Sequence, residues 1–263
     1  MKQSYIHYFF ILILILTLIF HLYSVKPTIK ILSWNILADE FIKQRYYPMI
    51  PAEILVNRHE RQRQIISTLK QLDMDVLLLQ EVMQGEYNRL AQTFERTHHL
   101  LRSKNIKWQG KPSYSGNVIL LRKSLFTLPA IMPLDFGLGV QCTYQKRPLY
   151  IFNVHLDDIS HATRMKQFAE LPIASPVIIG GDFNENYQAQ RPSELYQHIK
   201  KAGLKIVNHK PTYSIERKMC IDNILVKGLT LKHQSAYVPD DFQGDVVRQF
   251  ITYGSDHLPV VIN

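Results

Sequence analysis

The sequence predicts an α/β fold for the part of the chain that follows Pro27. Short apolar runs of β type alternate there with longer stretches in which apolar side chains recur at helical spacing. No internal repeat and no low-complexity segment interrupts this alternation. The periodicity does not decide whether the strands form one sheet or two.

Seven strands and four helices are expected in chain order. The strands are residues 29–34, 76–79, 116–122, 149–155, 177–181, 221–226 and 258–262. The helices are residues 58–72, 87–95, 162–171 and 193–202. The first helix carries the clearest signal, because its apolar residues recur at helical spacing and its other positions are charged. The apolar residues are Ile65, Ile66, Leu69 and Leu72, and the charged ones are Arg61, Arg63 and Lys70.

The composition indicates one folded domain over residues 27–263. Hydrophobic residues make up 46% of the 263 residues and charged ones 20%, which is the balance of a globular protein. Lysine and arginine outnumber aspartate and glutamate by 31 to 22, and the formal charge of +9 favours a polyanionic partner or an acidic membrane surface. The two cysteines, Cys142 and Cys220, are too far apart in sequence to suggest a disulfide framework or a zinc site.

The N-terminal residues differ from the rest of the chain. Residues 5–25 contain no Asp, Glu, Lys or Arg and are long enough for a helix that spans a bilayer, which needs roughly 20 apolar residues. We therefore expect an N-terminal hydrophobic helix and a membrane anchor at residues 1–26. A cleaved signal peptide, which would make the protein secreted, and a buried core helix are the alternatives. The orientation of this helix in a membrane stays open, because Lys2 precedes the apolar run while Lys26 and Lys30 follow it.

Polar residues end most of the predicted strands. These residues carry carboxylate, amide or imidazole groups, and they are Asn35, Glu81, His155, Asp182 and Asp256. Such groups at strand ends are typical of a site built on one rim of a sheet.

These side chains suit the hydrolysis of a phosphodiester, which needs charge neutralisation and an activated water. Glu81, Asp182, Asp222 and Asp256 offer the hard oxygen ligands that Mg²⁺ or Mn²⁺ prefers. His155 and His257 offer donors to phosphate oxygens, and Asn35 and Asn184 fix geometry without added charge. Each residue alone also has an ordinary structural explanation, such as a turn cap or a surface ion pair.

The set of motifs resembles the endonuclease/exonuclease/phosphatase superfamily. Its strings here are ILSWNILAD (31–39), LLLQEV (77–82), GNVILL (116–121), NVHL (153–156), GGDFNE (180–185), CIDNILV (220–226) and SDHLPV (255–260). The resemblance implies a four-layer α/β sandwich of two packed mixed β-sheets with outer helices. It implies metal-holding roles for Asn35, Glu81 and Asp256, and catalytic roles for His155, Asp182, Asn184, Asp222 and His257. We also expect Asn117, Arg164 and Tyr187 to contact the substrate.

Within this superfamily the motifs are most similar to the deadenylase and nocturnin-like branch. The string at residues 34–39, the tyrosines Tyr46 and Tyr47, and Arg58 and Arg61 carry the likeness, whereas Trp34 and Glu185 depart from it. The function expected is a Mg²⁺- or Mn²⁺-dependent nuclease acting on RNA or DNA. A membrane-associated phospholipid or phosphoinositide phosphodiesterase or phosphatase, and an inactive membrane-anchored nucleic-acid-binding module, are the alternatives. No protein partner is implied, and we expect a monomer.

Overall fold

The computed structural model describes residues 28–103, 107–108, 111–112, 115–187, 192–213, 219–231, 238 and 245–262. The expected N-terminal hydrophobic helix lies outside these residues. None of the helices within the described ranges is long and apolar enough to cross a membrane.

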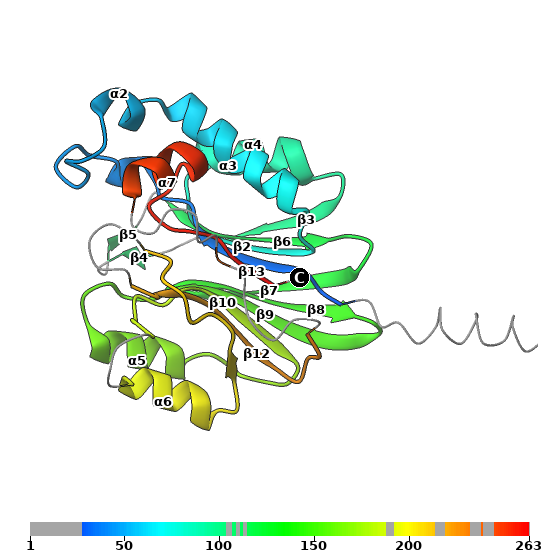
Figure 1. Cartoon of the computed structure of the whole chain (residues 1–263). Helices are drawn as coiled ribbons and strands as arrows, with labels where there is room; N and C mark the ends of the chain where they lie inside the picture. The colour runs from blue at the N-terminus through cyan, green and yellow to red at the C-terminus, as the bar shows by residue number, and fades with distance from the viewer. Residues whose placement is uncertain are drawn as a thin grey trace, which may run out of the picture.

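Two mixed sheets form the centre of the molecule (Figure 1). The first has the order β13 (Val260–Ile262), β1 (Ile31–Asn35), β2 (Val76–Val82), β6 (Gly116–Arg122) and β3 (His98–Arg102). The second has the order β11 (Lys205–Ile206), β12 (Asp222–Lys227), β10 (Val177–Asp182), β9 (Arg147–His155), β8 (Gly137–Tyr144) and β7 (Phe126–Leu134). A short ribbon pairs β4 (Lys107–Trp108) with β5 (Lys111–Pro112). β1 is parallel to β2, and β9 is parallel to β10.

Helices cover the outer face of each sheet, so the predicted α/β sandwich is confirmed (Figure 1). α3 (Arg58–Leu72) and α4 (Gln84–Phe94) pack on the first sheet, and α5 (His161–Ala169) and α6 (Glu194–Lys201) pack on the second. α7 (Val246–Tyr253) contacts α3. The 3₁₀ turn η1 (Asp39–Phe41) and the short α2 (Ala52–Leu55) lie between β1 and α3.

The structure contains elements that the sequence pattern did not predict, among them β3, β7, β8 and α7. β7 contains Pro129 and Pro133, which break a strand signal but are tolerated because β7 is the edge of its sheet. β8 contains Gly137 and Gly139, which lie against β9 where a Cβ atom would clash.

The two glycines that precede Asp182 are explained by close packing. A Cβ atom on Gly180 would lie 2.5 Å from Leu78 Cδ1, across the interface between the sheets. A Cβ atom on Gly181 would lie 1.9 Å from the carbonyl oxygen of Val154. Side chains are excluded at both positions, so β10 can approach its neighbours and bring Asp182 to the end of the sandwich.

A buried amide joins the two sheets beneath this end. Asn153 on β9 donates through Nδ2 to the carbonyl oxygens of Leu79 and Val118, at 2.9 Å each. Its Oδ1 accepts from Gln80 Nε2 at 2.7 Å. Leu79 and Gln80 belong to β2 and Val118 to β6, so one side chain fixes the second sheet to two strands of the first.

We expect Asn153→Ala to destabilise the protein by roughly 2–4 kcal/mol, since it leaves buried carbonyl and amide groups without partners and opens a small cavity. Urea unfolding followed by circular dichroism measures the change. Asn88→Ala, at an exposed position of α4, is the matched control and should leave the midpoint unchanged. Equal midpoints for the two variants would contradict this role for Asn153.

Candidate active site

Strand direction brings the predicted residues to one end of the sandwich. β1, β9 and β10 all end there, at Asn35, His155 and Asp182. In the strand register Asp182 lies opposite His155 on β9 and opposite Asp222 on β12. Asn35 and Asp182, which are 147 positions apart in sequence, therefore become neighbours.

Glu81 reaches this end through an irregularity in β2. The register of β2 against β6 shifts between Leu79 and Val82, and Glu81 has the left-handed φ of 59°. Such a bulge changes the direction of a side chain, at a cost in backbone strain that the surrounding contacts must offset. Glu81 Oε1 accepts from Asn35 Nδ2 at 2.8 Å, and Oε2 accepts from the backbone N–H of Ala38 at 2.8 Å.

Asp182 is buried and lies at the centre of the group. Its Oδ1 accepts from the backbone N–H of Asn184 at 2.9 Å, and its Oδ2 accepts from Asn35 Nδ2 at 3.2 Å. The Nε2 atoms of His155 and His257 each lie 3.8 Å from Oδ2. Burial, with a contribution from nearby Asp222, raises the pKa of Asp182 to about 6, against the opposing effect of the two histidines.

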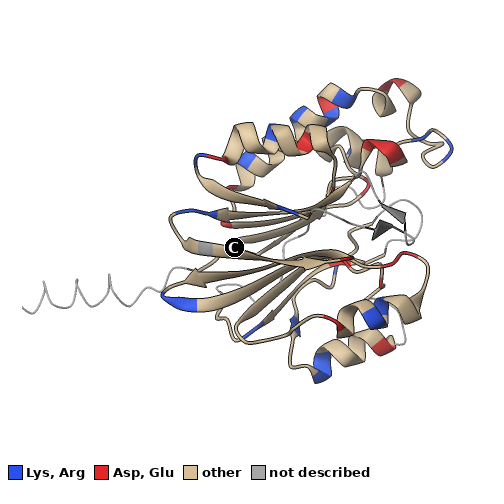
Figure 2. Ribbon diagram, turned by 180° about the vertical axis from the view of Figure 1, so that it is seen from behind, with Lys and Arg blue, Asp and Glu red and all other residues tan. Residues whose placement is uncertain are grey.

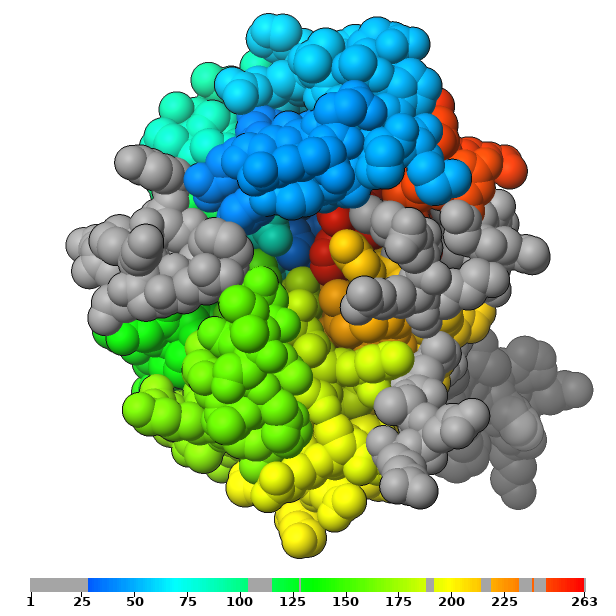
Figure 3. Space-filling model, turned by 90° about the vertical axis from the view of Figure 1, so that its left-hand side faces the viewer, coloured from blue at the N-terminus to red at the C-terminus, as the bar shows by residue number. Residues whose placement is uncertain are grey.

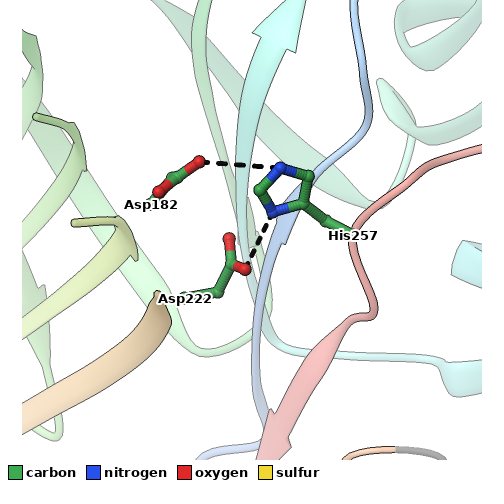
Figure 4. A group of neighbouring side chains, drawn as sticks. All are labelled: Asp182, Asp222 and His257. Atoms are coloured by element: carbon green, nitrogen blue, oxygen red, sulfur yellow. Dashed lines mark hydrogen bonds and ion pairs between the residues drawn. The ribbon is translucent and has the colours of Figure 1, made fainter. Parts of the chain in front are cut away.

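His257 lies between three carboxylates. Its Nδ1 is 2.8 Å from Asp222 Oδ2, and its Nε2 points toward Asp182 (Figure 4). Burial alone would lower the pKa of His257, but Asp222, Asp256 and Asp182 raise it well above the usual value. The Trp34 indole N–H donates to the His257 carbonyl oxygen at 2.9 Å, which fixes the backbone of this loop. The imidazole is therefore held as a charged donor.

The two oxygens of Asp256 have different surroundings. Its Oδ2 accepts from the Tyr47 hydroxyl at 3.0 Å, while its buried Oδ1 has no hydrogen-bond partner among the described residues and lies 3.9 Å from His257 Nε2. Burial raises the pKa of Asp256, and burial together with Asp256 raises the pKa of Tyr47, so the phenol stays protonated and acts as a donor.

The group of acidic side chains fits a divalent cation. Ligand atoms of Asp182, Asp222 and His257 lie within 4.8 Å of one another, so this cluster could hold a metal ion. His257 Nδ1 is bonded to Asp222, however, and His257 carries positive charge, which makes it a poor ligand in this arrangement. The carboxylates of Glu81 and Asp256 give the hard oxygen ligands that Mg²⁺ prefers, and Asp256 Oδ1, which accepts no hydrogen bond from the described residues, suits a metal ligand.

We expect Tyr47→Phe to weaken metal binding roughly tenfold while the protein stays folded, because it removes only the hydroxyl that orients the Asp256 carboxylate. The ring contact between Tyr47 and Phe250, with centroids 5.9 Å apart, is preserved. Calorimetric titration with Mn²⁺ measures the change. Tyr46→Phe is the control, because Tyr46 is exposed and makes no hydrogen bond to Asp256. Unchanged affinity in Tyr47→Phe would remove Asp256 from the metal site.

These residues open into a cleft of about 690 Å³. Figure 3 looks onto this end of the molecule and shows the hollow between the blue segment that follows β1, above, and the green to yellow segments around the ends of β9 and β10, below. The lining combines site residues with an aromatic and apolar wall, and it includes Phe41, Tyr46, Tyr47, Met49, Glu81, His155, Asp182, Asn184, Tyr213, Val246, Asp256 and His257. Asn35 and Asp222 lie behind this surface, buried beneath it.

Three residues predicted to contact the substrate do not line this cleft. Asn117 is 1% exposed and donates to the Asn153 carbonyl oxygen at 2.9 Å between the sheets. Arg164 Nε donates to Glu185 at 2.9 Å. Tyr187 is buried against Phe183 in the core under α5 and α6. The positions of Asn117, Arg164 and Tyr187 give no support for a direct substrate contact.

Sequence reasoning gave no separate role to several residues that hold the site in place. Trp34 and Tyr47 bond the segment 256–257, and the Ser255 hydroxyl donates to the Asn35 carbonyl oxygen at 2.7 Å. Trp34 lies in the WNILAD motif and Tyr47 follows this motif in sequence. This proximity to the motif was the only sequence feature that pointed to the two residues.

The fold and the site together define an enzyme that hydrolyses phosphoric esters. The model of the Endonuclease/Exonuclease/phosphatase family matches residues 32–257, and the chain belongs to that family, as the motifs predicted. Enzymes of this family typically use divalent metal ions. A comparison with curated proteins finds no match.

Solved structures share the fold at low sequence identity. ANGEL2, described as a 2′,3′-cyclic phosphatase, has a TM-score of 0.71 and 17% identity over 91% of this chain and 95% of that chain. TDP2 of D. rerio, solved with a single-strand DNA product, has a TM-score of 0.58 and 19% identity over 90% and 98%. The mannosyl-6-phosphatase Bt3783 of Bacteroides thetaiotaomicron has a TM-score of 0.58 and 15% identity over 90% and 99%. At these identities the likeness shows the fold alone.

Proposed function

We propose that the protein is a Mg²⁺- or Mn²⁺-dependent nuclease that hydrolyses phosphodiester bonds of RNA or DNA. The observation that carries the proposal is the convergence of Glu81, Asp182 and His257 in one cleft, with an aromatic wall beside them. A bound divalent cation would be held by Asn35, Glu81 and Asp256, and it would neutralise charge on the phosphate.

The protein's own side chains supply the proton transfer. Asp182, oriented by Asn184 N–H and Asn35 Nδ2, accepts a proton from the attacking water as the new P–O bond forms. His257 carries its positive charge toward the cleft through Nε2 and donates to a phosphate oxygen. His155, at the rim of the cleft, donates toward the oxygen of the ester bond that breaks, and this oxygen leaves as an alcohol.

The aromatic wall favours a nucleotide over other phosphate esters. The Tyr213 ring lies with its centroid 4.9 Å from that of His257, directly beside the phosphate position. Phe41 and the exposed Tyr46 continue the wall. Successive bases can stack on such rings without sequence preference. Lys43 and Arg45 on the same segment are exposed and suit a phosphate backbone.

One assay tests this function. Purified protein with Mg²⁺ is offered labelled poly(A), duplex DNA and sphingomyelin in parallel, with Glu81→Ala as the control. We expect metal-dependent cleavage of a nucleic acid and none with the variant. Absence of cleavage of any nucleic acid retires the nuclease proposal, cleavage of sphingomyelin alone supports the phospholipid alternative, and no cleavage at all supports a binding module.

We further propose that residues 1–26 attach the enzyme to a membrane, on the strength of the uncharged apolar run at residues 5–25. Flotation of the full chain with vesicles after a carbonate wash tests this attachment. Recovery of the protein in the soluble fraction would reject it.

A further inference from the structure

The described chain begins at the end of the sandwich that is opposite the cleft. β1 starts at Ile31 and ends at Asn35 in the site, and β9 and β10 run in the same sense toward it. The turns that join β6 to β7 and β8 to β9 therefore lie at the far end, beside the start of β1 (Figure 1). We call this end the base surface, and it is defined by Lys30, Lys123, Lys146 and Arg147.

The base surface exposes unbalanced positive charge. Lys123, Lys146 and Arg147 are exposed in the two turns that flank the paired ends of β7 and β8. Figure 2 shows blue segments at this end of the sheets. Among the residues that the structure describes, none of these three side chains forms an ion pair with a carboxylate. The Lys123 Nζ instead donates to a backbone carbonyl, that of Glu95.

The carboxylates on the first-sheet side of this end are largely neutralised. Asp73 and Asp75 both pair with Arg122, at 2.7 and 2.6 Å. Asp73 also lies 3.5 Å from Lys30 Nζ. The exposed Glu95 is followed by the exposed Arg96. The net charge of this end is therefore positive.

The distance between this end and the apolar run is short. The run at residues 5–25 ends at Val25, and Ile29 is already 5% exposed in the core. Four residues of fully extended chain span at most about 14 Å. If the run lies in a bilayer, the base surface must therefore stay close to the headgroups.

We propose that the base surface rests on an anionic bilayer surface, with the cleft facing away from that bilayer. The proposal depends on the membrane attachment proposed above and not on the nuclease activity. Clusters of lysine and arginine next to a membrane segment are attracted to anionic lipids. A domain of this length has a radius of gyration of roughly 18 Å, so the cleft lies roughly 40 Å from the headgroups. Substrates reach it from the aqueous side, and headgroups of the same bilayer do not.

Energy transfer from two labelled positions to headgroup-labelled acceptor lipids tests this orientation in full-length protein reconstituted into phosphatidylserine-containing nanodiscs. The donor dye is placed on Ser124→Cys in the base turn or on Met49→Cys at the cleft rim. The native Cys142 and Cys220 are buried, and burial raises the pKa of each thiol to about 12, so neither competes for the dye. We expect strong transfer from position 124 and transfer near background from position 49.

Charge-reversal variants test whether the positive charge of the base surface sets this orientation. Lys123→Glu, Lys146→Glu and Arg147→Glu combined should reduce the difference between the two positions, as should 1 M salt, where the Debye length falls to about 3 Å, because the short connection to residue 25 then holds the base surface near the bilayer without fixing its tilt. The matched control, Lys166→Glu, Lys200→Glu and Lys201→Glu, changes the same charge on α5 and α6 and should keep the full difference. Equal transfer from both positions in the parent protein, a difference that charge reversal leaves unchanged, or protein that does not associate with the discs would each overturn the proposal. Nuclease activity is not a readout in any arm.

Discussion

Asp182→Asn is expected to lower kcat by about 10³-fold on whichever phosphodiester the enzyme cleaves, within the usual range for loss of a general base. The amide keeps the shape of the carboxylate and its place between Asn35 and the two histidines, but it cannot accept the proton of the attacking water. Measurement of single-turnover rates at saturating Mg²⁺ separates this step from product release.

The same variant should be more stable than the parent protein when metal is removed by chelation. Asp182 lies buried near Asp222, and that environment raises its pKa to about 6, which means that its ionisation at neutral pH costs more in the folded protein than in the unfolded chain. A neutral amide removes this penalty, so the thermal midpoint should rise while activity falls. A loss of both activity and stability would indicate that Asp182 has a structural role instead.

Asp135→Asn provides the control for charge. Asp135 is exposed in the turn between β7 and β8 and does not line the cleft. This substitution should leave the rate unchanged. A comparable loss of rate in the control would show that net charge, and not proton transfer at residue 182, determines the effect.

How far the fold could be predicted depends on how each strand is buried. β2, β6 and β10 are buried almost throughout and read as continuous apolar runs, so the pattern found them. β7 is an edge strand, and β8 beside it packs through glycines. A half-exposed strand that contains proline shows neither a continuous apolar run nor a regular alternation of apolar and polar residues. Its conformation depends on hydrogen bonds to the neighbouring strand, which its own sequence does not reveal. α3 matched its predicted range because both its apolar stripe and its Asn57 cap are local.

The residues of the candidate site differ in the same way. Some can be recognised from their neighbours in sequence, and others only from contacts with residues far along the chain. Asn35, Asp182 and His257 stand out in sequence because each polar side chain interrupts or ends an apolar run, and the structure brings all three together. Tyr47 could not be assigned in this way, because its hydroxyl bonds Asp256, 209 positions further along the chain. Arg164 was expected to contact the substrate, but its Nε donates to Glu185, and this pairing between residues 21 positions apart could not be predicted from the local sequence.

Arg61 supports the candidate active site from its buried side, and the sequence pattern did not predict this position either. Its side chain is 2% exposed in α3, and its NH1 donates to the carbonyl oxygens of Ile36 and Leu37 at 2.9 and 2.8 Å and of Gly254 at 3.1 Å. The NH2 bonds Asp39. One guanidinium thus joins the turn after Asn35 to the loop that carries Asp256 and His257.

Arg61→Ala is expected to destabilise the protein by about 3–5 kcal/mol, the usual cost of removing one partner of a buried ion pair. Asp39 would keep only its pair with the exposed Arg58, the buried Glu86 would lose an ion pair of 3.7 Å, and three carbonyl groups would lose their donor. Arg61→Lys should restore only part of the stability, because a single ammonium cannot reproduce the planar set of donors. Urea unfolding measures both changes.

Arg63→Ala distinguishes this role from the general loss of a cation in α3. Arg63 lies two residues along the same helix, its side chain is 73% exposed, and it pairs with Glu60 one turn away. Exposed pairs of this kind contribute little, so its unfolding midpoint should match that of the parent. Because Arg61 fixes both segments that supply site residues, its variant should also lose activity under conditions where it remains folded. Full activity in folded Arg61→Ala would mean that the strands alone set the geometry of the site.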